Sequence, residues 1–305
     1  MLDPTLRNMI IEMLSHELSS DQIDEIGNFM LHGHSTHSSL GIGDHITVSS
    51  RKAAAALLDE CMNNRCEEKL LKFIVELDGE KLLGKGVELK DLERLLNQLA
   101  KNGYIYDSKK GKFRKIKESI DDMPNWGALK NGKQYEISVG SIDIAGSSEL
   151  VKKHGHKKME KLYYEFWGLL RRILSNYDGR IWSWQGDGGL VAFAFKGHQE
   201  RCVLFSMELQ QLIKVFNINP RKSIPEDIKL RIGLDTGKVK YLNETGKIIS
   251  DTINYAAHLE KSFSKPGEIT ISQELLEKVP ESILHLFQEK KKFEERTALV
   301  CSWIE

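Results

Sequence analysis

From residue 135 onward, short strand-like runs alternate with longer amphipathic helical runs. Strictly alternating or short unbroken apolar runs predict strands, and apolar residues spaced by three and four predict helices. The predicted strands are 135–144, 180–185, 190–195, 229–234, 238–242, 268–272 and 297–304, and the longer predicted helices are 159–175, 202–216 and 251–263. An α+β sandwich, with a sheet on one side and helices on the other, fits this order.

Two acidic residues lie beside glycines where predicted strands end. Asp143 lies at the end of the strand 135–144, which the small residues 145–148 follow, whereas Asp187 lies in the Gly186–Gly189 turn between two strands. Carboxylate oxygens suit Mg²⁺ or Mn²⁺, and small residues before a helix let backbone amides approach a phosphate. Each aspartate alone is typical of a turn or a helix cap. Together they predict a metal site for a triphosphate.

A stretch without periodicity separates this region from the first part of the chain. It contains Pro124, Gly127 and Gly132, which favour a linker. Helical patterns dominate the residues before it. The predicted division is a smaller, mainly helical domain at 1–118, a linker at 119–133 and an α+β domain at 134–305.

The helical domain carries no pattern of catalytic residues, so a sensor or adaptor-like module with a protein partner is expected. Its Ala-rich helix, capped by Ser49 and Ser50, resembles the small adaptor modules called effector-associated domains at residues 50–58. The loop 33–43 and its flank contain His32, His34 and His37. We interpret it as a polar loop, with a metal site as the alternative.

A predicted helix at 89–99 runs into a basic hairpin at 103–113. A winged helix would use the lysines and arginine of such a hairpin to bind phosphates: Lys109, Lys110, Lys112, Arg114 and Lys115. The alternative is a solvated hairpin edge that resists aggregation, which we favour. Nucleic acid is therefore not the expected partner.

The charge balance excludes a bulk electrostatic attraction to nucleic acid or anionic lipid, because 44 basic residues match 44 acidic ones. Four cysteines without paired spacing are typical of free thiols in a reducing compartment. No run reaches the roughly 18 apolar residues of a membrane span. We expect a soluble, cytoplasmic protein that has no membrane segment.

Three later segments complete a recognisable series: 230–237 (LRIGLDTG), 250–260 (SDTINYAAHLE) and 265–272 (KPGEITIS). With the Asp143 and Asp187 segments, they occur in the order found in class III nucleotidyl cyclases, and residues 135–305 closely resemble that catalytic domain. The resemblance implies a ferredoxin-like sandwich. It also implies conversion of a nucleoside triphosphate into a 3′,5′-cyclic nucleotide and pyrophosphate.

The resemblance also implies roles for individual residues. Asp143, Asp187 and the backbone carbonyl of Ile144 would bind two Mg²⁺ or Mn²⁺ ions, one at the ribose 3′-oxygen and one at the phosphates. Asn254 would orient the ribose. The residues expected to cradle the triphosphate are Ile144, Ala145, Gly146 and Ser147. Because the family builds each site from two cyclase domains, a homodimer with two sites is implied.

Three positions depart from the family pattern. His258 replaces an arginine that stabilises charge on the α-phosphate, so slower turnover or a substitute cation, Arg296 or Lys292, is expected. Ser183 and Lys247 occupy the two base-reading positions, in place of the adenine-reading lysine and its acidic partner. Strand alternation predicts that Trp182 and Trp184 share one face, where we favour packing over base stacking.

These departures leave the base open. Nonstandard base-reading positions, a single cyclase domain expected to be soluble and an adaptor-like N-terminal part together resemble the pyrimidine cyclases of bacterial anti-phage defence. Those enzymes make cyclic CMP or cyclic UMP, and ATP or GTP remains the rival substrate. A non-catalytic nucleotide sensor on the same fold is the alternative function. A DNA-binding regulator that uses the basic hairpin is a third hypothesis.

Overall fold

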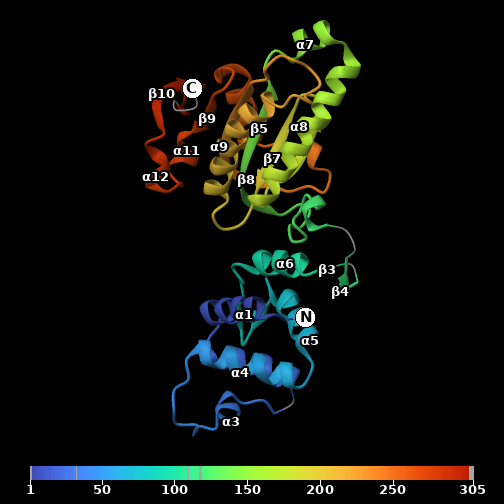
Figure 1. Ribbon diagram of the computed structural model, residues 1–305. Helices are drawn as coiled ribbons and strands as arrows, with labels where there is room; N and C mark the ends of the chain where they lie inside the picture. The colour runs from blue at the N-terminus through green and yellow to red at the C-terminus, as the bar shows by residue number, and fades with distance from the viewer. Residues whose placement is uncertain (1, 32, 109, 117–118, 302–305) are drawn as a thin grey trace. The chain divides into compact units, whose positions relative to one another are not determined.

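The computed structural model describes residues 2–31, 33–108, 110–116 and 119–301. Predictions that involve His32, Lys109 or the strand end at 302–304 lie outside these residues. The chain forms two compact units, one of Met1–Ile120 with Trp126–Ala128 and one of Asp121–Asn125 with Leu129–Glu305 (Figure 1). No helix among the described residues is both long enough and apolar enough to span a membrane.

The first unit is mainly helical, as predicted. Its helices and strands are α1 (Pro4–Glu17), α2 (Ser20–Met30), α3 (Thr36–Leu40), α4 (Ser50–Asn63), α5 (Glu67–Leu77), β1 (Lys81–Leu82), β2 (Lys85–Gly86), α6 (Leu92–Lys101), β3 (Tyr104–Asp107) and β4 (Lys112–Lys115). The Ser49 cap is confirmed, since its side chain accepts a hydrogen bond from the Lys52 amide. The predicted hairpin is confirmed as the β3–β4 pair.

The histidine loop differs from the prediction of a polar loop. It contains the short helix α3, and the His34 side chain is fully buried with its Nδ1 2.7 Å from Glu60 Oε2 of α4. His37 Nε2 lies 2.8 Å from the Ile46 carbonyl oxygen. The two rings therefore hold the loop together.

The second unit contains a seven-stranded sheet in the order β10-β11-β9-β8-β5-β7-β6. Its elements are η1 (Ile120–Asp122), β5 (Gln134–Ile144), α7 (Ser147–His154), α8 (His156–Asn176), β6 (Arg180–Gln185), β7 (Gly188–Phe193), α9 (His198–Asn217), β8 (Leu230–Lys240), η2 (Thr245–Lys247), α10 (Asp251–His258), η3 (Leu259–Phe263), β9 (Ile269–Ser272), α11 (Gln273–Leu276), α12 (Glu281–Leu284), β10 (Phe287–Phe293) and β11 (Arg296–Cys301). The central order β8-β5-β7-β6 is that of a ferredoxin-like βαββαβ unit, which confirms the predicted fold class.

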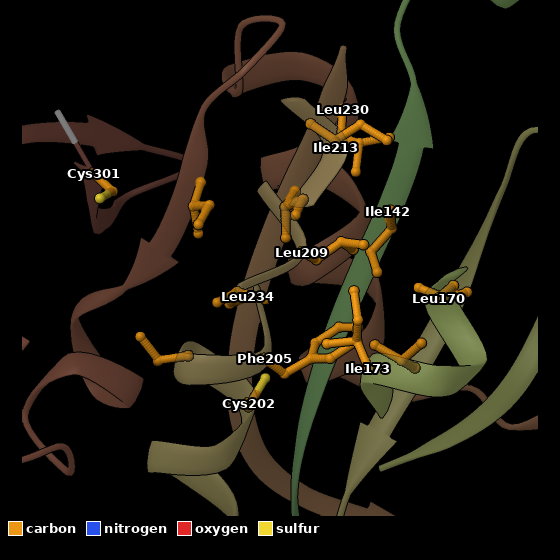
Figure 2. Packing of buried hydrophobic residues seen from close by; sticks show 14 of the residues in the cluster. Ile142, Leu170, Ile173, Cys202, Phe205, Leu209, Ile213, Leu230, Leu234 and Cys301 are labelled. Carbon is orange, nitrogen blue, oxygen red and sulfur yellow. The ribbon is translucent and has the colours of Figure 1, made fainter. Parts of the chain in front are cut away.

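The core lies between this sheet and helices α8 and α9 (Figure 2). Ile142 of β5 and Leu234 of β8 point toward Ile173 of α8 and Leu209 of α9, and all four are almost completely buried. Burial of side chains of this kind stabilises a fold by about 1.5–3 kcal/mol each. Successive residues of a strand face opposite sides, so the neighbours of Ile142 face away from this core.

Helix α10 packs against the opposite face of the sheet. A Cβ atom on Gly233 of β8 would lie 2.2 Å from the Ala256 carbonyl oxygen of α10, which explains why glycine occurs there. The inner side of α10 is buried at Thr252, Tyr255 and Ala256. The intervening positions Asn254 and His258 are exposed.

Four details differ from the predictions. The strands predicted at 229–234 and 238–242 form one strand, β8, because Asp235 and Thr236 are buried and paired with β5. Strand β10 was not predicted. The helix predicted at 251–263 ends at His258 and continues as a π-helical turn. A register shift between Ile181 and Ser183 breaks the expected alternation of β6.

Candidate active site

Two neighbouring strands and a hairpin bring Asp143 and Asp187 together. Asp143 is the second-last residue of β5 and pairs with Gly188, the first residue of β7. The Ile144 amide donates a hydrogen bond to the Asp187 carbonyl oxygen at 3.2 Å, which fixes the hairpin against the end of β5. A Cβ atom on Gly188 would lie only 2.8 Å from the Ile142 carbonyl oxygen, a backbone atom that cannot easily move, so this close approach favours glycine.

The surroundings of the Asp143 carboxyl group, Asp187 among them, change its electrostatics. Burial raises the pKa of Asp143, and the like charge of Asp187 adds to this effect, whereas a hydrogen bond from Arg231 opposes it. Arg231 Nη2 lies 2.5 Å from Asp143 Oδ2. Asp187 accepts a hydrogen bond from the Ser147 hydroxyl at the start of α7. Arg231 therefore offsets only part of the negative charge that the two half-buried carboxylates bring to this site.

This donor set fits a divalent metal ion. Hard carboxylate oxygens held close together repel one another, and Mg²⁺ or Mn²⁺ would relieve that repulsion. Among the residues that the structure describes, no group of three or more His, Cys, Asp and Glu side chains is arranged to hold a metal. Asp143 and Asp187 would thus supply two side-chain ligands, and phosphate, water or backbone oxygens would supply the others. Mg²⁺ commonly binds in this way.

The loop after Asp143 has the geometry expected of a phosphate cradle. Gly146 has φ = 70°, in the left-handed region that favours glycine, and α7 begins at the next residue. The first amides of a helix have no intrahelical acceptor and can bind an anion. The Ala145 amide, however, donates to the Lys229 carbonyl oxygen at 2.9 Å. Gly146 and Ser147 are therefore better placed than Ala145 to offer amides to phosphate.

Three residues near the carboxylates were not predicted as site residues. Arg231 is the β8 partner of Asp143, and its Nε lies 3.2 Å from Glu260 Oε1. Burial raises the pKa of Glu260 to about 7, and the Asp143 charge contributes. Burial, Asp187 and Asp143 together raise the pKa of Tyr163 on α8. Arg231 and Glu260 lie inside the segments 230–237 and 250–260, but only the β5–β8 register reveals that Arg231 meets Asp143, and Glu260 joins this group through its ion pair with Arg231.

Asn254 and His258 lie on the exposed side of α10, four residues apart. Among the described residues, no hydrogen bond or ion pair connects either side chain with Asp143 or Asp187. His258 Nδ1 lies 2.8 Å from Oε1 of Glu294, between β10 and β11. Among the residues that the structure describes, the expected ribose and phosphate residues are therefore not bonded to the carboxylates of the same chain.

The two residues predicted to read the base, Ser183 and Lys247, occur in adjacent elements. Ser183 is paired with Leu190, which is itself the partner of Ser141 on β5, so Ser183 faces the same side of the sheet as Asp143. The η2 turn that carries Lys247 contacts β6, because the Thr245 hydroxyl donates to the Trp182 carbonyl oxygen. Lys247 Nζ itself lies 2.6 Å from Glu244 Oε2.

The prediction that Trp182 and Trp184 share a face is wrong, because the β6 bulge lies between Ile181 and Ser183. Trp184 packs on the α8 side, with its ring centroid 6.1 Å from that of Phe166. Trp182 is 3% exposed and donates from Nε1 to the Pro124 carbonyl oxygen. Both rings take part in packing.

Arg296 was predicted as a substitute for the missing arginine. Its guanidinium makes two hydrogen bonds to Asp235, of 3.2 and 3.0 Å, and its Nε lies 3.1 Å from Glu274 Oε1. Its side chain therefore belongs to a network of ion pairs at β8 and α11. Lys292, the other substitute considered, is exposed.

A family model described as "Adenylate and Guanylate cyclase catalytic domain" matches residues 129–297. A cytidylate cyclase of Staphylococcus aureus is 28% identical over 172 residues, which are 54% of this chain and 37% of the relative. A putative adenylate cyclase 3 of Rhizobium meliloti is 28% identical over 141 residues, 46% of this chain and 22% of the relative. The chain thus spans well under half of each relative's length.

Among solved structures, a dimeric guanylyl cyclase domain of the RhoGC fusion protein from Blastocladiella emersonii is 23% identical to this chain. The alignment covers 56% of this chain and 97% of that domain, with a TM-score of 0.48. The adenylyl cyclase CyaB from P. aeruginosa is 22% identical, with 56% and 95% coverage and a TM-score of 0.47.

Proposed function

Because the chain belongs to the adenylate and guanylate cyclase catalytic domain family, we propose that it converts a nucleoside triphosphate into a 3′,5′-cyclic nucleotide and pyrophosphate. One observation carries the proposal: Asp143 and Asp187 meet at the end of β5, next to the start of α7. Catalysis of phosphoryl transfer depends on positioning and on stabilising negative charge, and hard anionic ligands for metal ions beside helix amides can serve both purposes.

In the proposed reaction, the ribose 3′-oxygen attacks the α-phosphorus as the bond to pyrophosphate breaks. Asp143, Asp187 and the Ile144 carbonyl oxygen would hold two Mg²⁺ or Mn²⁺ ions, whose positive charge would favour ionisation of the 3′-hydroxyl and offset the charge of the phosphates. Gly146 and Ser147 would bind the phosphates through backbone amides. Asn254 would orient the ribose, and His258 would donate a hydrogen bond to the α-phosphate in place of an arginine.

We further propose that the active unit is a homodimer. Asn254 and His258 are exposed, and among the described residues no hydrogen bond or ion pair joins either side chain to Asp143 or Asp187. A two-fold dimer would place the α10 face of one protomer opposite the carboxylates of the other, and it would form two equivalent sites.

The proposed substrate is a pyrimidine nucleotide, CTP or UTP. Ser183 and Lys247 cannot reproduce the lysine and acid pair that reads adenine, and a similar protein is named cytidylate cyclase. A serine hydroxyl both donates and accepts, so it suits the polar edge of a smaller base. ATP and GTP are the rival substrates.

The experiment is to incubate purified protein with Mn²⁺ and each of ATP, GTP, CTP and UTP, and to identify cyclic products by mass spectrometry. We expect cyclic CMP or cyclic UMP. Asp143→Ala and Asp187→Ala should abolish product and leave the circular dichroism spectrum unchanged. Near-wild-type turnover in either variant would contradict the site assignment.

The second candidate is a non-catalytic nucleotide sensor. It is favoured by the contact between His258 and Glu294, because His258 stands at the position of the family's phosphate-stabilising arginine and its Nδ1 is already paired with a carboxylate. Triphosphate binding without product from any of the four nucleotides would support it. A role in anti-phage signalling is proposed from the resemblance to pyrimidine cyclases. It predicts that expression reduces phage plaques and that Asp143→Ala removes the protection.

A further inference from the structure

The last hairpin of the chain contacts helix α10 at two points. Glu294, in the turn between β10 and β11, lies 2.8 Å from His258 Nδ1. Two residues later, the Arg296 guanidinium carbon lies 3.7 Å from the centroid of the Tyr255 ring. The hairpin therefore contacts the residue that immediately follows Asn254.

Arg296 is fixed on its other side by two carboxylates. Asp235 of β8 is 1% exposed and accepts two parallel hydrogen bonds from Arg296. Glu274 of α11 accepts a third from Nε at 3.1 Å. A planar guanidinium suits such a bidentate pair and can stack on an aromatic ring at the same time, which a lysine ammonium cannot do.

Tyr255 transmits this anchoring to α10. Its ring is 5% exposed and packs with Leu259, Ala298, Phe263 and Phe293. Its hydroxyl donates to the Phe293 carbonyl oxygen at 3.3 Å. One rotation of α10 about its axis is thereby favoured, and that rotation also sets the direction of Asn254 and His258.

We propose that Arg296 is a positioning residue that orients the catalytic face of α10 through its stacking on Tyr255 and its anchor on Asp235. This role differs from the phosphate-contacting role expected of a substitute cation, and its catalytic part depends on the proposed function. A shift of about 1 Å in a positioned group can cost roughly a hundredfold in rate, so the anchor matters for turnover.

The first test needs no substrate. Amide hydrogen exchange of residues 251–258 is measured in the nucleotide-free protein for wild type, Arg296→Ala, Arg296→Lys and Asp235→Asn. We expect exchange in α10 to rise at least about fivefold in all three variants, while exchange in α8 and α9 stays within about twofold of wild type. Arg221→Ala, at an exposed arginine of the same unit, serves as the matched control and should not change α10.

The second test separates positioning from phosphate binding. In the cyclase assay, Arg296→Lys should lose at least about tenfold in kcat, as Arg296→Ala does, with KM changed by less than about twofold. The two losses from Arg296→Ala and Asp235→Asn should not add in the double variant, because both break one contact.

Two results would overturn the proposal. One is unchanged α10 exchange in Arg296→Ala, together with a raised KM and partial rescue by lysine, which describes a phosphate contact. The other is a rise shared equally by α8, α9 and α10, which describes general stabilisation of the fold. If wild type forms no cyclic product, the proposed function fails, whereas the exchange experiment still decides whether Arg296 orders α10.

Discussion

At the scale of single residues, Glu260 has an environment far from that of an ordinary glutamate. It is 8% exposed, lies beside Arg231 and has a pKa raised to about 7 by burial and by Asp143. A folded state that binds this proton more tightly than the unfolded state is most stable when the proton is present. The stability that proton binding at Glu260 gives to the folded state is fully present below pH 4.5, the ordinary pKa of the group, and is lost as the pH rises through about 7.

Glu260→Gln should therefore flatten this dependence. As the pH rises from 5 to 8, the free energy of unfolding of the variant should increase relative to that of wild type. The increase is at most about 3 kcal/mol, since one pKa unit corresponds to about 1.4 kcal/mol. Urea unfolding of both proteins at the two pH values measures the change. Glu281→Gln, at an exposed glutamate, is the control and should change little. An equal pH response in Glu260→Gln and wild type would contradict the account.

The sequence predicts part of this residue-level picture. Asp143 and Asp187 stand out because each precedes small residues at a strand end, and the structure brings them together. Arg231 and Glu260 do not stand out, because an arginine in a strand and a glutamate in a helix have many roles. Their meeting with Asp143 depends on the pairing of β5 with β8 and on the end of α10, which one-dimensional patterns do not contain.

At the scale of structural elements, the β6–β7 hairpin positions the site. Gly188 is the first residue of β7, and both the backbone of β5 and the Asp143 side chain lie close to it. A Cβ atom there would lie 2.8 Å from the Ile142 carbonyl oxygen and 3.0 Å from Asp143 Oδ1. Backbone atoms cannot move aside cheaply, so a larger residue must push the hairpin away.

Gly188→Ala should thus weaken both metal binding and the fold. We expect Mn²⁺ affinity to fall at least about tenfold and the free energy of unfolding to fall by about 1–3 kcal/mol. Gly168→Ala on α8 is the matched control, because a Cβ atom there meets nothing within 4 Å. Mn²⁺ titration and urea unfolding measure both effects. Unchanged Mn²⁺ affinity in Gly188→Ala would argue against the close approach.

Elements were predicted well where their apolar pattern was strong. Helices α8 and α9 and strands β5 and β6 occur where alternation and helical spacing placed them. Strand β10 was missed, since residues 289–292 are all charged and resemble a solvated loop. The bulge in β6 was missed as well, because one extra residue leaves no mark in the pattern of apolar side chains.

At the scale of the whole molecule, the account requires two chains for each site. The carboxylates of one protomer would face Asn254 of its partner. A variant that lacks a carboxylate and a variant that lacks Asn254 should therefore complement each other when they form a mixed dimer. Mixing Asp143→Ala with Asn254→Ala should give heterodimers with one intact site. If half of the dimers are mixed, roughly a quarter of wild-type activity returns.

The control mixture is Asp143→Ala with Asp187→Ala, which should remain inactive because both changes fall in the same half-site. Subunit exchange is allowed to reach equilibrium, and heterodimers are counted by native mass spectrometry with one chain carrying a mass tag. Activity restored in the control mixture, or absent from the first mixture despite heterodimers, would mean that the halves are not shared between protomers.

The central claim is that Asp143 and Asp187 bind the same metal ions, and electron paramagnetic resonance of Mn²⁺ tests it most directly. Free Mn²⁺ is titrated with wild type, Asp143→Ala, Asp187→Ala and Asn254→Ala, with and without 3′-deoxy-CTP or 3′-deoxy-ATP, which cannot cyclise. Each aspartate variant should lose at least about tenfold in Mn²⁺ affinity, while Asn254→Ala keeps that of wild type. Wild-type Mn²⁺ affinity in both aspartate variants would contradict the account.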